Sequence, residues 1–100
     1  KGTFVAAYSI VHVTKPTTLQ FTVAADDAQA VAVARVYYNS ADHQWHLEEK
    51  PRLIESNWGY TPGRYRTFTV DFSSPGYYII VIYFADTCCG GGLYVKVNEV

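Results

Sequence analysis

The chain has 100 residues, of which 49% are apolar and 17% are charged, and its net charge is −1. High apolar content with little charge excludes an intrinsically disordered chain. Without an excess of Lys and Arg there is no basic field to hold a phosphate backbone, so nucleic acid is not an expected partner. The length suits one domain with a single hydrophobic core.

The sequence begins with Lys1 and contains no Met. Because translation starts at Met, we expect the chain to be a processed product or a segment of a longer protein. Its longest apolar run, residues 77–85, is shorter than the roughly 20 residues of a membrane-spanning helix, so we expect a buried strand there and no transmembrane segment.

Apolar and polar residues alternate with period two along much of the chain, which is the period of a β-strand. The expected strands cover residues 4–13, 17–23, 30–38, 44–48, 64–72, 77–85 and 93–97. Residues 49–63 are the least regular part, because Pro51 and Gly59 interrupt any long element. Pro75 and Gly76 predict a tight turn, in which Pro fixes φ and Gly supplies a positive one.

Short strands separated by turn residues predict an all-β fold, an antiparallel β-sandwich or jelly roll of about 7–9 strands in one domain over residues 1–100. The strand over 77–85 is expected to be central because it is the most apolar. The residues expected in the core are Phe21, Phe68, Val70, Ile80 and Ile82.

Two stretches resemble the protective-antigen domain, a β-sandwich lectin module of adhesins and glycosidases. In residues 18–28 a strand leads into paired Asp residues, and residues 75–84 form a Gly-Tyr strand that a Gly-rich loop and a last strand over 90–95 follow. The second half is also similar to the bacterial pre-peptidase C-terminal domain. Ala28 departs from the first family's pattern, which usually has Gly. The resemblance implies a secreted, non-catalytic carbohydrate-binding or adhesion module.

Asp26 and Asp27 are the best candidate site. Adjacent carboxylates repel each other, so a loop that holds both toward one point needs a cation, and hard oxygen ligands suit Ca²⁺. The resemblance implies that the pair holds Ca²⁺, which in turn holds sugar hydroxyls, with Asp86 and carbonyls of residues 88–92 completing the site. The alternative is a solvated polar turn, where Asp is common.

Cys88 and Cys89 are the only cysteines, and they are adjacent. A disulfide between neighbours departs from ordinary disulfide geometry. Three states therefore compete: a vicinal disulfide that stiffens a loop, disulfides to another chain, and reduced thiols. We favour an oxidised state, which agrees with an extracellular or cell-surface location.

Aromatic side chains provide a second candidate site. Trp58 and Tyr60, with Trp45 and Tyr65, are candidates for a platform that stacks on sugar rings or docks a neighbouring chain. The alternative is that loop aromatics fold back over an open end of the sandwich. No nucleophile elbow or phosphate-binding loop is present, and we expect no enzymatic activity.

Two functions remain open. The first is a carbohydrate-binding or adhesion module, Ca²⁺-dependent in its sharpest form. The second is a structural subunit of an extracellular filament or surface layer, which binds copies of itself through strand donation and aromatic contacts. The apolar segment 4–13, the low charge, the nine Tyr residues and the cysteines support the second function, since an exposed apolar strand is a hazard unless another chain completes it.

Overall fold

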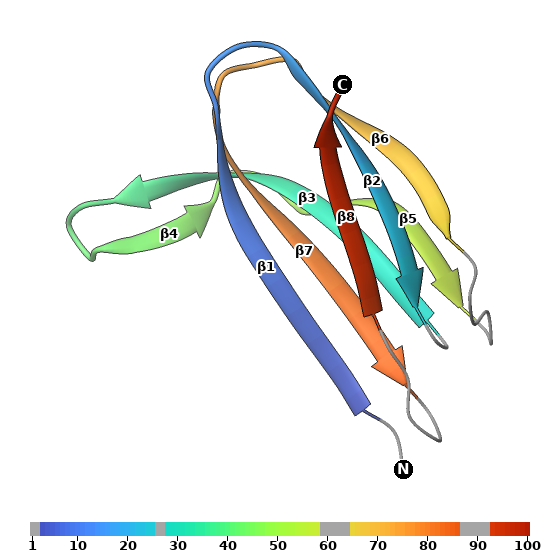
Figure 1. The fold of residues 1–100 in the computed structure, drawn as a ribbon. Helices are drawn as coiled ribbons and strands as arrows, with labels where there is room; N and C mark the ends of the chain where they lie inside the picture. Colours follow the sequence, from blue (N-terminus) through green and yellow to red (C-terminus); the bar gives the residue numbers. More distant parts are fainter. Residues whose placement is uncertain (1–2, 26–27, 59–64, 87–92) are drawn as a thin grey trace.

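A computed structural model of the chain describes residues 3–25, 28–58, 65–86 and 93–100. In these residues the chain forms antiparallel strands and no helix, so none of the described segments is a helix able to cross a bilayer (Figure 1). The strands are β1 (Thr3–Val13), β2 (Thr17–Ala25), β3 (Ala28–Asn39), β4 (Gln44–Leu47), β5 (Arg52–Trp58), β6 (Arg66–Phe72), β7 (Gly76–Asp86) and β8 (Leu93–Glu99). The predicted all-β antiparallel sandwich and its strand number are confirmed.

The strands form two sheets. In the large sheet β7 lies between β1 and β3, while β4 and β5 both pair with β3; in the small sheet β2 lies between β6 and β8. β7 pairs with β1 along its whole length and with β3 over nine positions. The segment expected to be the central strand therefore is central, because its apolar side chains need neighbours on both sides.

The core lies between the two sheets, where the inward faces of the alternating strands meet. Phe21 is 1% exposed and its ring stacks on Phe68, with 5.4 Å between the centroids. Val70 and Ile80 are buried with them, and Ile82 and Phe68 are partly buried against this cluster. The five residues expected in the core are thus found there.

β5 is the strand that the sequence pattern did not predict. It pairs with β3 at an edge of the large sheet, and the register shifts between Val31 and Ala32. A register shift interrupts the period-two pattern, since residues on the two sides of it change face. The alternation of β5 is hidden for that reason. β2 and β3 are also longer than expected, so only residues 26–27 connect them.

Arg35 of β3 fastens the turn between β6 and β7. Its Nη1 donates to the Tyr78 hydroxyl and its Nη2 donates to the Pro75 carbonyl, both at 2.7 Å, while the Tyr78 hydroxyl donates to the Ser74 carbonyl at 2.8 Å. Gly76 has φ of +149°, and a Cβ there would lie 2.6 Å from Arg35 Nη2. The predicted Pro-Gly turn with a positive φ is confirmed.

We expect Gly76→Ala to destabilise the fold by about 1–3 kcal/mol, because the backbone conformation disfavours a Cβ and the Arg35 guanidinium occupies its place. Urea denaturation measures the loss. Ser73→Ala, at an exposed position in the same turn, is the control. A Gly76→Ala change within about 0.5 kcal/mol of the native chain would contradict this account of the turn.

Ile80→Ala tests the central place of β7. Ile80 is buried in the core cluster, and large-to-small substitutions of this kind cost about 2–5 kcal/mol through lost burial and the cavity left behind. Thr69→Ala, exposed on β6, should stay within about 0.5 kcal/mol. Equal effects of the two substitutions on the free energy of unfolding would show that β7 is not the core strand.

Candidate binding surfaces

The small sheet is narrower than the large sheet that it covers. At one margin β6 lies beside β5, where Arg66 pairs with Glu55. From there β2 and β8 continue across the large sheet, and the described part of the small sheet ends at β8 (Figure 1). No described strand of the small sheet faces β1, so one side of the sandwich is open.

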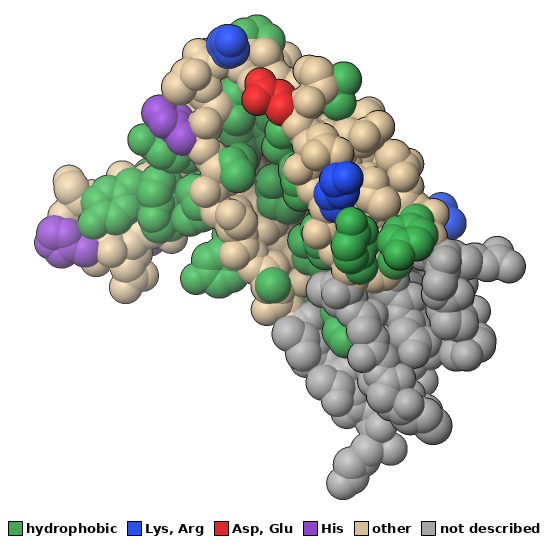
Figure 2. Space-filling model, in the orientation of Figure 1, with side chains coloured by type: hydrophobic (Ala, Val, Ile, Leu, Met, Phe, Trp, Pro, Cys, Tyr) green, Lys and Arg blue, Asp and Glu red, His purple; other side chains and the backbone are tan. Residues whose placement is uncertain are grey.

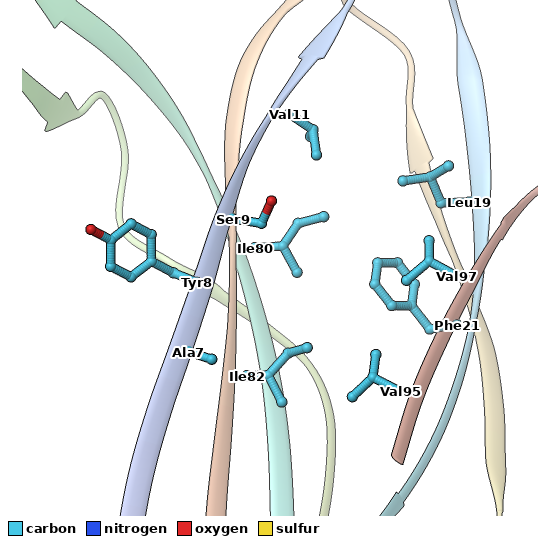
Figure 3. Close-up of a pocket in the computed structure, with 10 residues that line it drawn as sticks. All are labelled: Ala7, Tyr8, Ser9, Val11, Leu19, Phe21, Ile80, Ile82, Val95 and Val97. Atoms are coloured by element: carbon cyan, nitrogen blue, oxygen red, sulfur yellow. The ribbon is translucent and has the colours of Figure 1, made fainter. Parts of the chain in front are cut away.

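A cleft of about 390 Å³ occupies this open side, between β1 and β8 (Figure 3). Its lining is almost entirely apolar and comes from Leu19 and Phe21 of β2, Ile80 and Ile82 of β7, Val95 and Val97 of β8, and Ala7, Ser9 and Val11 of β1. Tyr8 of β1 also borders the cleft, although its ring points away from it to the other face of the large sheet. Figure 2 shows hydrophobic side chains along the hollow between the sheets.

The cleft exists because the inward residues of β1 are small. Ala7 is paired with Ile82 and Ser9 with Ile80, so neither fills the space in front of its larger partner. On the other side, Val97 is opposite Phe21 in the small sheet and faces the cleft, yet it is 46% exposed. Val97 therefore points inward, but no described residue covers it from the side of β1.

Two strand edges border the mouth of the cleft. β1 pairs only with β7, and β8 pairs only with β2, as far as the described residues show. The remaining edge of each strand presents backbone N–H and C=O groups, which form a template for another strand. An apolar floor between two open edges has the features of a site for an extended peptide, whose backbone is held by the edge and whose alternate side chains fill the pockets.

A row of aromatic rings crosses four strands on the other face of the large sheet. His12 of β1 stacks on Tyr77 of β7 at 4.2 Å, Trp45 of β4 lies 5.0 Å from Tyr77, and Tyr38 of β3 lies 5.4 Å from Trp45. The rings of Tyr38, Trp45 and Tyr77 are each between a third and a half exposed. Of these residues, only Trp45 was expected in a binding platform.

The other expected platform residues lie elsewhere. Tyr65 contacts Tyr94 with 5.5 Å between ring centroids. The backbone of Trp58 is paired with Ala28, whereas Trp45 is paired with Tyr38, ten positions further along β3, which corresponds to about 33 Å. The structure therefore does not bring Trp45 together with Trp58. Tyr60 lies outside the described residues.

Part of the calcium site predicted from the resemblance lies outside the described residues. Asp26, Asp27, Cys88 and Cys89 are not among the described residues, and of Asp86 only the backbone is described. No cluster of three or more His, Cys, Asp or Glu side chains occurs in the rest of the chain as described.

The strand pairing nevertheless places three of the segments predicted to form the site next to one another at Ala28. This residue directly follows Asp27, and it is paired on one side with Ala85, which precedes Asp86, and on the other side with Trp58. The connection over 26–27 thus leaves from the same end of the large sheet at which β5 and β7 end.

Gln29, the next residue of β3, is the one buried polar residue found in the described part of the chain. It is 2% exposed, and neither its Nε2 nor its Oε1 has a hydrogen-bond partner there. A buried amide without partners is rare and often marks an ordered water, an ion or a ligand. This end of the sandwich is therefore a second candidate site.

Comparisons with protein-family models, curated proteins and solved structures found no match for the chain.

Proposed function

We propose that the chain is a non-catalytic structural subunit, which assembles with other copies by accepting an extended segment in the cleft between β1 and β8. The observation that carries this proposal is the missing cover of β1. The large sheet continues past the edge of the small one, and the apolar residues beneath that overhang are left in an open cleft.

The free edge of β8 is the side on which a further strand extends the small sheet over β1. Val95 and Val97 face the cleft, while Lys96 and Asn98 alternate with them and are exposed. A segment paired with β8 places every second side chain above Ile80 and Ile82. Burial of one Val, Leu or Ile side chain contributes about 1.5–3 kcal/mol, so a few such residues suffice for a stable contact.

Val97→Lys should abolish this assembly, because an inward-pointing charge at a sheet edge prevents another strand from docking. We expect sedimentation velocity and negative-stain microscopy to show filaments or oligomers larger than a dimer for the native chain and their loss in Val97→Lys. The folded subunit should remain, since Val97 is half-exposed.

Asn98→Lys is the matched control, with the same new side chain on the same strand but on the exposed face. It should assemble like the native chain. Equal assembly of Val97→Lys and Asn98→Lys, or a native chain that forms nothing larger than a dimer at its highest soluble concentration, would rule out the cleft as the assembly site.

A Ca²⁺-dependent carbohydrate-binding module is the second candidate function. The register at Ala28 and the unpartnered amide of Gln29 favour it, since both occur at the end of the sandwich where the predicted Ca²⁺ ligands belong. The backbone of Trp58 ends β5 at this same end of the large sheet. The row that contains Trp45 lies at the opposite end of β3 and belongs to a separate surface.

If Asp26 and Asp27 bind Ca²⁺, the cation should raise the melting temperature, because a ligand that binds only the folded state stabilises by about 2.7 kcal/mol at a hundredfold excess over its dissociation constant. Differential scanning calorimetry with Ca²⁺ and with a chelator measures the change. Asp27→Asn should remove the rise and Glu99→Gln, on exposed β8, should keep it. Identical melting curves with Ca²⁺ and chelator would count against this function.

A further inference from the structure

The outward face of the large sheet is apolar along most of its length. Residues paired across antiparallel strands point to the same face, so the register identifies its members row by row. The rows are Tyr8, Val81, Ala32 and Leu53; then Ile10, Ile79 and Ala34; then His12, Tyr77, Val36 and Leu47. None of these residues is Asp, Glu, Lys or Arg, and the aromatic row described above continues from the last of them.

The small sheet shows what a solvated face looks like in the same molecule. Its outward residues on the three strands are mostly polar: Thr18, Gln20, Thr22 and Ala24; Thr67, Thr69 and Asp71; Tyr94, Lys96 and Asn98. Antiparallel sheets commonly keep one face on the core and one in water, which gives alternation of apolar and polar residues. The small sheet follows this rule and the large sheet departs from it.

The exposed surface of the chain is larger than its mass requires. A compact monomer of 11.2 kDa exposes about 5,700 Å², whereas this chain exposes 6397 Å². Its radius of gyration is 14.8 Å, against about 13 Å for a compact chain of this length. The chain is therefore less compact than an average monomer of its mass, with principal extents of 44 × 32 × 17 Å.

We propose that the outward face of the large sheet is the interface of a homodimer, in which two large sheets pack face to face. β1 and β7 are eleven residues long, and four paired strands about 4.8 Å apart make a face of about 35 by 19 Å, or some 650 Å² in projection. Two such faces bury on the order of 1,300 Å², which lies within the range of specific interfaces.

A second copy is the occupant that this face fits. The face carries no formal charge that would need a complementary partner, and the net charge of −1 gives little repulsion between copies. Ala32 and Ala34 of β3 are 7% and 0% exposed, and Ile79 and Val81 beside them on β7 are half-buried. A second copy therefore covers Ile79, Val81 and the exposed side chains at the margins of the row, and a two-fold axis brings the same face of each copy together.

Charges placed at Tyr8 and Leu53 test the proposal. The two residues are at opposite ends of one row and are 72% and 61% exposed, so substitution should leave the fold intact. In sedimentation equilibrium we expect a dimer for Val97→Lys, in which assembly through the cleft is blocked. In the same background Tyr8→Glu/Leu53→Glu should raise the dissociation constant of the dimer at least about a hundredfold, since each unpaired charge buried against an apolar face is expected to cost tenfold or more.

Tyr94→Glu is the matched control, because Tyr94 is an exposed tyrosine on the outward face of the small sheet. In the Val97→Lys background it should leave the dimer unchanged, which separates this interface from assembly through the cleft. A Val97→Lys chain that stays monomeric over the whole concentration range overturns the proposal, as does a Tyr8→Glu/Leu53→Glu change that affects the dimer no more than Tyr94→Glu. Binding of monomers to phosphatidylcholine vesicles, with no dimer in their absence, would assign the face to lipid and overturn it too.

Discussion

β7 is apolar on both of its faces, and the rest of the structure follows from that constraint. Tyr78, Ile80 and Ile82 point into the core, and Ile79 and Val81 between them point to the other side of the large sheet. Such continuous apolar runs are typical of strands covered on both faces. A two-layer sandwich covers only one of them, and the proposed dimer is the arrangement in which a second copy covers the other.

The same shortage occurs on the inner face at β1. There the small sheet ends at β8, and the inward side chains of β1, such as Ala7 and Ser9, are too small to fill the remaining space. The uncovered outward face and the unfilled space at the inner face of β1 are separate surfaces, since the side chains of β1 point alternately to the one and to the other. Polar residues at corresponding places of the small sheet, such as Thr22 and Lys96, show that the fold itself does not demand apolar residues at solvent-facing positions.

The alternation of apolar and polar residues was enough to predict the fold class and most strands, because every second residue of a half-buried strand faces the core. β5 was missed where that alternation is broken by the register shift at Val31 and Ala32. The run over 77–85 revealed a buried strand, but alternation cannot say which layer covers each face. The contact of Trp45 with Tyr77 was beyond prediction, because it depends on the pairing of strands far apart in the sequence. The candidate site around Ala28 was suggested by the family resemblance. Its segments lie near each other because their strands are paired, which their spacing in the sequence does not reveal.

The two proposed contacts differ in symmetry, and this difference decides what they build together. Strand donation joins two unlike surfaces, so it is a head-to-tail contact that continues from copy to copy. Packing of the large sheets joins like surfaces about a two-fold axis and closes after two copies. The polar outward face of the small sheet, with Thr69 and Asn98 among its residues, offers no third apolar contact. A filament held by both proposed contacts would therefore consist of two rows of subunits side by side, joined along their large sheets, and could not thicken further through the faces described here.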